Sequence, residues 1–409
     1  MNLLKVDTIT TAREKLKEIM NRRVIETISI ELRSAQGYIL AKDIVSHEMV
    51  PAFKRSTVDG YAVVSSDTAG ASENLPVFLE IVDEVSMGEQ SRVEIHKGQC
   101  VYVPTGGMIP TGADAMVMVE YCEIFEENQI AVYSAVANGK NLVLPGEDMR
   151  VGDVVLRRGT RIGPREIGAL ACLGIVRIEV YKPLTVTILS TGDELVSPDS
   201  TLPIGKIRDI NTYLLQAEAV KLGFLVVETK VLVDDEELLK RTMLEAMTGS
   251  DMVIVSGGSS QGKKDATERI IDEVASMGSF LHGLAIKPGK PTILGYDEDT
   301  STLLVGLPGH PVAAFLVFKL LIGWMWEEMT GQTEQLPVVA HITSNLASAP
   351  GKLTCQLVNL YKQGIEFYAE PIFGKSGLIT TLTRSNGYIL IDQNKEGLRK
   401  DEVVEVFYL

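Results

Sequence analysis

Carboxylate side chains follow three successive apolar stretches in the middle of the chain. Asp193 and Glu194 stand in T-G-D-E-L, which directly follows T-V-T-I-L-S, Asp234 and Asp235 follow L-V-V-E-T-K-V, and Asp265 follows M-V-I-V. Carboxylate oxygens suit a hard cation such as Mg²⁺, which commonly bridges to substrate phosphates. An aspartate at the start of a helix is also a favourable cap, so capping is an equally open role for Asp234, Asp235 and Asp265.

A glycine-rich loop stands between the third apolar stretch and the helix expected after it. The loop begins S-G-G-S-S-Q-G and contains Gly257, Gly258, Ser259 and Ser260. Glycines let backbone approach a ligand closely, and backbone N–H groups at a helix start can hold an anion. The loop lacks the lysine of a G-x-x-x-x-G-K-[ST] phosphate loop, so a generic nucleotide hydrolase is the least favoured interpretation.

Two proline-glycine turns follow, K-P-G-K-P from Lys287 and L-P-G-H-P from Leu307. Lys287 and Lys290 could face one small oxyanion from a rigid turn, or stay as solvated surface lysines. Pro311 suits the first position of a helix, and a metal role for His310 is disfavoured because no second histidine is near it. The loop and the two turns together suggest one anion-handling face.

The elements that must position these residues alternate between strand and helix from Leu184 onward. Apolar residues at helical spacing separate the strands, with Leu215 and Ala219 in one helix and Leu239 and Met243 in the next. This alternation predicts a mostly parallel, doubly wound sheet with helices on both faces. Ligands of such sheets gather at the carboxyl ends of the strands, where the carboxylates and the glycine loop stand.

Shifts in composition along the chain predict four domains. An amphipathic helix is expected from Ile9 to Ile19, and short β-rich runs between Gly, Pro and Asn residues follow further along. We expect a discontinuous N-terminal domain, a small β-rich domain, an α/β domain and a C-terminal β domain, which span residues 1–47 with 138–180, 48–137, 181–330 and 331–409.

Composition limits the class of protein. With 409 residues, 45% of them hydrophobic and 23% charged, the chain has enough apolar material for several folded cores. Its formal net charge of -15 would repel nucleic acid and acidic membrane surfaces. An anionic ligand must therefore be small and locally bound, and nucleic acid is not an expected partner.

Cysteine spacing and hydropathy bear on the compartment. Cys100, Cys122, Cys172 and Cys355 form no C-x-x-C pair, so we interpret them as buried reduced thiols rather than zinc ligands or disulfides. The start M-N-L-L-K-V-D-T has no secretory pattern, and we expect a cytoplasmic protein. The uncharged stretch Thr300–Phe318 contains P-G-H-P, so strand, turn and helix are expected there instead of a membrane span.

Seven motifs in order along the chain resemble those of one family. They are D-G-Y-A, P-T-G-G-x-x-P-x-G-A-D-A, G-E-D, T-G-D-E-L, S-G-G-x-S-x-G-x-x-D, K-P-G-K-P and L-P-G-H-P. The chain resembles the MoeA family, the molybdopterin molybdenumtransferases related to the C-terminal part of gephyrin. The resemblance implies an elongated homodimer, with each active site between the molybdopterin-binding α/β domain and a domain of the partner subunit. It also implies Mg²⁺-dependent cleavage of adenylylated molybdopterin, release of AMP and insertion of molybdenum from molybdate.

The resemblance carries functional roles to residues at matching motif positions. The family's functional carboxylates correspond to Asp59, Asp148, Glu194, Asp234 and Asp265, of which the last three are expected to bind the metal ion. Substrate binding is expected at Thr105, Gly257, Gly258, Ser259, Ser260, Pro308 and Pro311. Molybdate binding is expected at Lys287, Lys290, Pro291 and Ser376. A tetrahedral dianion is well matched by lysines, hydroxyls and backbone N–H groups.

Some positions depart from the family pattern. Lys54 and Arg55 precede D-G-Y-A, His310 replaces a common Asn, and Leu357 occupies a position that is often Arg. Two alternatives stay open at this point. The protein could prefer tungstate, which has similar size and charge, or it could be a non-catalytic pterin-binding scaffold.

Overall fold

The computed structural model describes residues 6–257, 264–333 and 335–409, and the side chains of Lys264 and Asp265 lie outside this description. The chain forms two compact units. The first unit comprises residues 1–42, 158–163 and 177–409, and the second comprises residues 43–157 and 164–176. The four-domain division expected from the sequence stays a prediction.

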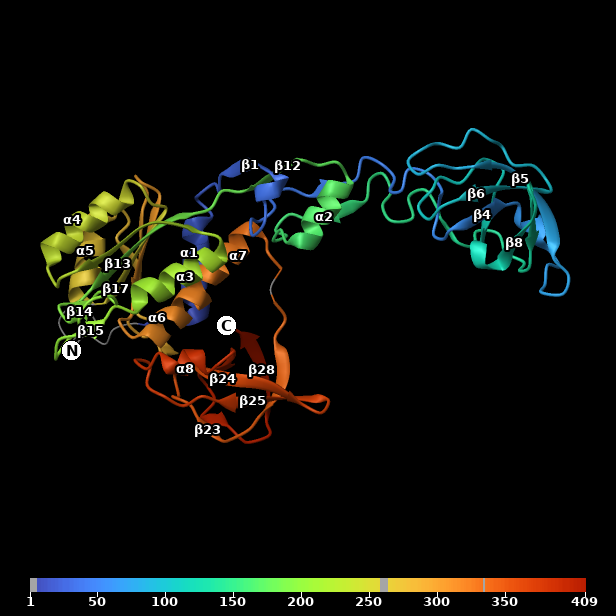
Figure 1. Cartoon of the computed structure of the whole chain (residues 1–409). Helices are drawn as coiled ribbons and strands as arrows, with labels where there is room; N and C mark the ends of the chain where they lie inside the picture. The colour runs from blue at the N-terminus through green and yellow to red at the C-terminus, as the bar shows by residue number, and fades with distance from the viewer. Residues whose placement is uncertain (1–5, 258–263, 334) are drawn as a thin grey trace. The chain divides into compact units, whose positions relative to one another are not determined.

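A six-stranded sheet is the centre of the first unit (Figure 1). Its first four strands are parallel and its last two are antiparallel to their neighbours. In spatial order the strands are β16 (Leu225–Leu232), β13 (Thr185–Thr191), β17 (Met252–Gly257), β21 (Thr302–Leu307), β20 (Ile293–Asp297) and β18 (Ser279–His282). The strands expected at T-V-T-I-L-S, L-V-V-E-T-K-V and M-V-I-V are confirmed.

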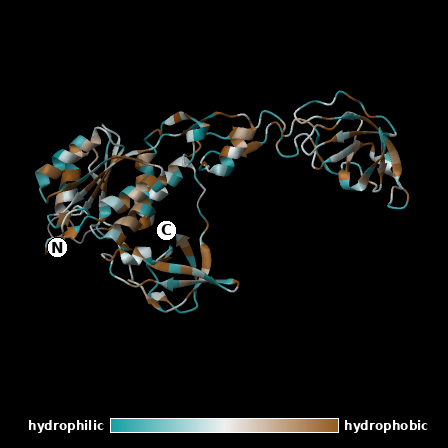
Figure 2. Ribbon diagram, viewed as in Figure 1, coloured by the Kyte–Doolittle hydropathy of each residue, from teal (hydrophilic) through white to brown (hydrophobic). Residues whose placement is uncertain are grey.

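Helices cover both faces of this sheet (Figure 1). Alternate strand residues such as Ile188 and Ile254 share one apolar cluster with α3 (Asn211–Leu222) and α6 (Pro311–Val317). Their neighbours in the strands join the opposite cluster with α4 (Glu236–Met247) and α5 (Lys264–Val274). These helices mix hydrophilic and hydrophobic residues, as expected when one side faces a core (Figure 2). The doubly wound fold is therefore confirmed.

The first helix packs onto the same unit. Helix α1 (Ile9–Met20) is capped by Thr8, whose hydroxyl oxygen accepts a hydrogen bond from the Thr11 N–H at 3.2 Å. Arg13 donates two hydrogen bonds, at 3.1 and 2.9 Å, to the carbonyl of Leu320. That carbonyl lies in a π-helical segment, η4 (Phe318–Gly323), which continues α6 into α7 (Trp324–Thr330).

A closed ring of five strands forms the C-terminal part of the chain. Each strand pairs with two others of the ring, which leaves no free edge among them. The strands are β22 (Val338–Ile342), β24 (Leu353–Gln363), β25 (Glu366–Pro371), β26 (Gly387–Ile391) and β28 (Val403–Tyr408). The short strand β19 (Ile286–Lys287) pairs with the start of β24, so the K-P-G-K-P turn is attached to this barrel.

The second unit is built on another six-stranded sheet. In spatial order its strands are β7 (Ala115–Met118), β4 (Gly60–Val63), β6 (Gln99–Val103), β5 (Val77–Glu84), β9 (Gln129–Val132) and β8 (Cys122–Glu126). Helix α2 (Pro164–Cys172) also belongs to this unit. The small β-rich fold expected for this region is confirmed.

Short elements complete the chain. The paired ones are β1 (Thr27–Glu31) with β12 (Arg177–Tyr181), β2 (Ile44–Val45) with β11 (Val154–Leu156), β3 (Arg55–Ser56) with β10 (Leu142–Val143), β14 (Leu195–Val196) with β15 (Ile207–Arg208), and β23 (Leu346–Ala347) with β27 (Gly397–Leu398). The short helices are η1 (Leu32–Ser34), η2 (Ser65–Thr68), η3 (Val119–Tyr121) and α8 (Thr380–Thr383).

The fold bears on the expectations for the uncharged stretch and for the cysteines. The uncharged stretch contains strand β21, a turn and helix α6, as expected, and none of the described helices is long and apolar enough to cross a membrane. The interpretation of all four cysteines as buried thiols was wrong, because Cys172 is exposed at the end of α2. Cys100 and Cys355 are buried, and burial raises the pKa of the Cys100 thiol to about 12.

Candidate functional site

The carboxyl ends of β13 and β16 bring two acidic loops together. The backbone N–H of Asp234 donates to Asp193 Oδ1 at 3.0 Å, and the N–H of Asp193 donates to Asp234 Oδ2 at 3.4 Å. Glu194 is exposed next to this pair, and its carboxylate folds back over Gly192, where an added Cβ would lie 2.8 Å from Glu194 Oε2. The expected gathering of carboxylates at this sheet edge is present for Asp193, Glu194 and Asp234.

Gly257 ends β17 directly beside the end of β13. It has φ +134°, and an added Cβ would lie 2.2 Å from the carbonyl oxygen of Thr191. Only glycine therefore fits this close approach of the two strand ends. Gly258, Ser259 and Ser260 lie outside the described residues.

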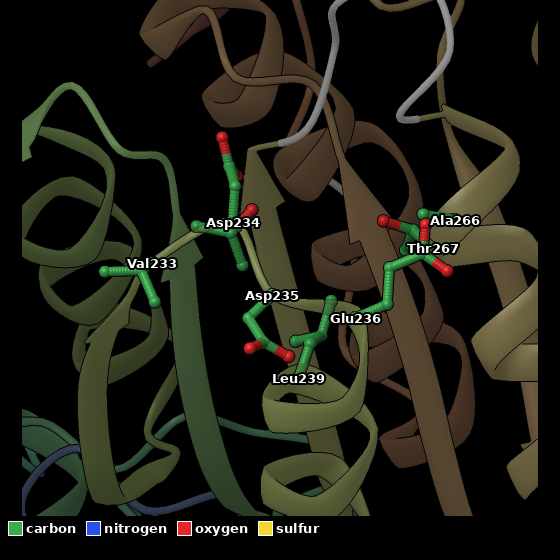
Figure 3. Close-up of a pocket in the computed structure, with 8 residues that line it drawn as sticks. Val233, Asp234, Asp235, Glu236, Leu239, Ala266 and Thr267 are labelled. Carbon is green, nitrogen blue, oxygen red and sulfur yellow. The ribbon is translucent and has the colours of Figure 1, made fainter.

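A small pocket of about 70 Å³ opens at the same edge (Figure 3). Thr191, Asp234, Asp235 and Thr267 contribute oxygen atoms to its lining. Asp235 caps α4, because its Oδ1 accepts a hydrogen bond from the Leu238 N–H at 2.9 Å. The capping role considered for Asp235 is thus confirmed, whereas Asp234 precedes the cap and makes the reciprocal contact with Asp193.

The carboxylate donors of Glu194 and Asp234 at this edge suit a magnesium ion that keeps water and phosphate among its ligands. All of them are oxygen atoms, which Mg²⁺ prefers, and Mg²⁺ usually takes only one or two carboxylates from a protein. Within the described residues, no group of three His, Cys, Asp or Glu side chains could hold a metal ion by itself. The side chain of Asp265, the third expected ligand, lies outside the description.

A much larger cleft, of about 900 Å³, lies between the two proline-glycine turns and the C-terminal barrel. Its lining brings together five of the residues predicted to bind substrate or molybdate, namely Lys287, Lys290, Pro291, Pro308 and Ser376. Pro311 is buried and begins α6, as its expected helix position requires. Three of the four residues predicted to bind molybdate come from one turn, and the fourth comes from the segment before α8.

The cleft is strongly positive. Lys352 and Lys375 line it together with Lys287 and Lys290, and its described lining contains no aspartate or glutamate. Leu357 and Cys355 contribute apolar surface from β24, and burial raises the pKa of the Cys355 thiol, so this thiol is protonated at neutral pH. A positive cleft in a chain of net charge -15 is a local site for a small anion.

His310 and Ser376 connect the L-P-G-H-P turn to the segment before α8. His310 Nδ1 lies 2.8 Å from Ser376 Oγ, within hydrogen-bond distance. The backbone N–H of Val312 donates to the carbonyl of Ser376 at 3.2 Å. Both side chains line the cleft, so this contact holds Ser376 beside the lysines.

Asn211, which was not singled out from the sequence, links the cleft to the sheet edge. Its Nδ2 donates to Ser256 Oγ at 2.7 Å and to the carbonyl of Gly309 at 2.9 Å. The first bond reaches the end of β17 and the second reaches the L-P-G-H-P turn. A polar side chain at the start of a helix, in R-D-I-N, was the available signal, but its partners lie far away in the chain.

The remaining predicted residues lie in the second unit. Asp59 Oδ1 accepts a hydrogen bond from the backbone N–H of Thr105 at 2.7 Å, so these two predicted residues are neighbours. Asp148 is exposed, and its backbone N–H donates to the carbonyl of Val50 at 3.0 Å. Lys54 and Arg55 are also exposed.

Three family models match the chain in succession. The model of the MoeA N-terminal region (domain I and II) matches residues 8–174, that of a probable molybdopterin binding domain matches residues 187–326, and that of the MoeA C-terminal region (domain IV) matches residues 339–409. A putative molybdopterin biosynthesis protein of Methanocaldococcus jannaschii is 34% identical over 97% of this chain and 95% of its own length. The chain belongs to the MoeA family.

Other MoeA relatives agree over the full length. A molybdopterin molybdenumtransferase of Haemophilus influenzae is 32% identical over 98% of both chains. The crystal structure of a molybdopterin biosynthesis MoeA protein of Pyrococcus horikoshii has 32% identity and a TM-score of 0.84, and covers 99% of this chain and 100% of its own. The expected family and multidomain fold are confirmed. MoeA membership places the chain in molybdenum cofactor biosynthesis.

Proposed function

We propose that this MoeA-family chain is a molybdopterin molybdenumtransferase that acts on adenylylated molybdopterin and molybdate, with release of AMP. The positive cleft carries this proposal, because four lysines and the Ser376 hydroxyl surround a space of about 900 Å³ without an opposing carboxylate in the described lining. Such a site fits a tetrahedral dianion. We assign molybdate to this cleft, with Lys287 and Lys290 as its main cationic contacts.

The acidic sheet edge is proposed to cleave the phosphoanhydride. In this step water attacks one of the two phosphorus atoms of the anhydride, and the bond from that phosphorus to the bridging oxygen breaks. The products are AMP and the pterin phosphate. One of them keeps the bridging oxygen and the other takes the oxygen of the water. Glu194 and Asp234 would orient the water and, together with Asp265, would hold Mg²⁺. The ion, when bound, neutralises charge on the phosphate oxygens. Asp59, Thr105 and Asp148 are proposed to contact substrate because the family resemblance implies this role for residues at these motif positions.

Some features of the proposal come from the family resemblance. We infer a homodimer in which a partner subunit completes each active site, and a cytoplasmic location. The backbone of Gly257 and of the loop after it, with Ser259 and Ser260, is proposed to hold the pterin substrate beside Pro308 and Pro311. The cleft suits tungstate as well as molybdate, since the two oxyanions share charge and shape.

The test is release of AMP from adenylylated molybdopterin by the purified protein. We expect release that requires Mg²⁺ and is stimulated by molybdate or by tungstate, and the more effective oxyanion identifies the metal. Tight binding of the adenylylated pterin with no AMP in any condition would contradict catalysis and leave a pterin-binding scaffold.

A further inference from the structure

Strand β8 of the second unit leaves apolar side chains open to solvent. Ile124 is 68% exposed and Phe125 is 62% exposed, although natural proteins usually cover or charge a strand at the end of a sheet. Among the described strands only β9 pairs with β8, so the other edge of β8 is free. Strand β8 therefore combines the apolar content of an inner strand with the position of an edge strand.

Ile124 ends a row of residues that face the core of this unit. Leu79 in β5 lies beside Ile130 in β9, and Ile130 lies beside Ile124 in β8. Leu79 is 1% exposed and Ile130 is fully buried, whereas Ile124 is mostly open. The apolar row therefore continues one strand beyond its cover, and a further strand beside β8 would bury its last member.

An aromatic pair crosses β9 on the opposite face of the sheet. The rings of Phe78 in β5 and Phe125 in β8 meet edge to face, with 4.9 Å between their centroids. Ala131 of β9, which pairs with Phe78, is buried, because a small side chain fits where the two rings meet. Exposed rings beside a free backbone edge are typical of a surface that binds another chain.

The surroundings of this edge are acidic. Residues 115–137 contain no lysine, arginine or histidine. Their exposed carboxylates are those of Glu120, Glu123, Glu126 and Glu127. Like charges would meet if the β8 strands of two copies lay side by side, which disfavours a second copy of this chain as the occupant. Lysine or arginine side chains on the incoming segment would complement the edge.

We propose that the free edge of β8 binds an extended segment of another protein, in which lysine or arginine residues alternate with apolar ones. The backbone of the segment pairs with β8, its apolar side chains cover Ile124 and the aromatic pair, and its cations meet the glutamates. This docking site goes beyond the proposed function and does not depend on it. None of its residues belongs to the proposed catalytic or molybdate-binding sets.

The experiment measures the fluorescence anisotropy of a labelled peptide, Lys-Val-Lys-Phe-Lys-Val-Lys, titrated with the full chain. A second peptide keeps the same side chains and charge but carries methyl groups on its internal backbone nitrogens, which removes their N–H donors. Ile124→Gln and Phe125→Gln each remove apolar surface from one face of β8. Ile365→Gln, at a 92% exposed position between β24 and β25, is the matched control.

We expect the wild-type protein to bind the unmodified peptide roughly tenfold more tightly than the methylated one, the effect of one or two net backbone hydrogen bonds. Ile124→Gln and Phe125→Gln should each weaken binding of the unmodified peptide by roughly tenfold, because each removes buried apolar contact. Ile365→Gln should bind as the wild type does. Circular dichroism and the thermal midpoint establish that each variant is folded.

Three results would overturn the proposal. Equal affinity for the two peptides, or normal affinity in both β8 variants, would show attraction to the negative chain as a whole. Absence of binding by the folded wild-type protein would remove the site. A wild-type oligomer that dissociates in Phe125→Gln, seen by light scattering, would show that a second copy covers the edge. Each result leaves the proposed reaction intact, because release of AMP is measured separately.

Discussion

Asp234 and Asp235 are adjacent residues with different surroundings. Asp235 caps α4, whereas Asp234 faces Asp193 at the sheet edge. We expect Asp234→Asn to lower the rate of AMP release by at least about a hundredfold, because it removes a charge proposed to hold Mg²⁺. Asp235→Asn is the matched control, and because asparagine also caps helices well, it should retain most of the activity and stability. Equal activity losses in the two variants would argue against a special role for Asp234.

Lys290 is an exposed lysine whose backbone is fixed in the turn. Its carbonyl accepts hydrogen bonds from the N–H groups of Leu284 at 2.9 Å and Thr292 at 3.0 Å, so only the side chain is free to reorient. Lys290→Ala should weaken molybdate binding by about tenfold to a hundredfold, the loss of one charged hydrogen bond. Equilibrium dialysis of molybdate measures this. Lys362→Ala, on β24 outside the cleft lining, should bind normally.

At the scale of elements, Asn211 holds the L-P-G-H-P turn against the end of β17. Removal of its side chain leaves Ser256 Oγ and the carbonyl of Gly309 without this donor, at a cost of about 1–3 kcal/mol in the free energy of unfolding. We expect Asn211→Ala to shift the urea midpoint downward and to raise the KM for the adenylylated pterin. The exposed Asn394→Ala serves as control. If Asn211→Ala is destabilised but its KM is unchanged, Asn211 contributes to stability alone and the predicted effect on substrate binding is contradicted.

The sequence predicted elements better than the contacts between them. Apolar periodicity was enough for β13, β16, β17 and the helices α3 and α4, because each depends on a local pattern. The positive cleft could not be predicted in this way, because its lysines come from segments that are far apart in the sequence. The pairing of β19 with β24 brings the K-P-G-K-P turn to the barrel. In the sequence, Lys352 and Lys375 look like ordinary surface lysines, and Asn211 looks like an ordinary residue at the start of a helix.

At the scale of the whole molecule, Asp251 connects segments that lie far apart in the chain. Its carboxylate accepts hydrogen bonds from the Thr185 N–H at 2.7 Å and the Thr185 hydroxyl at 2.8 Å, and it forms an ion pair with Arg23. Burial by itself would raise the pKa of the Asp251 carboxyl, but the hydrogen bonds from Thr185 and Arg23 outweigh burial and lower that pKa below its ordinary value.

This lowered pKa has a consequence for stability. The contribution of Asp251 is present above the pKa of the unfolded chain, near 3.9 for an aspartate, and is lost as the pH falls through the lower folded value. We expect Asp251→Asn to lose about 1–3 kcal/mol of unfolding free energy at neutral pH and much less in strong acid. Urea unfolding at both pH values checks this. An equal loss of unfolding free energy at neutral pH and in strong acid would contradict a role for the charge of Asp251.

The most direct test of the proposed function counts two products in one reaction. The purified protein is mixed with adenylylated molybdopterin, Mg²⁺ and molybdate, and the AMP released is compared with the molybdenum that becomes bound to the pterin. We expect equal amounts of both, and a loss of both in Asp234→Asn. Release of AMP without molybdenum on the pterin would show a hydrolase and contradict the transferase function.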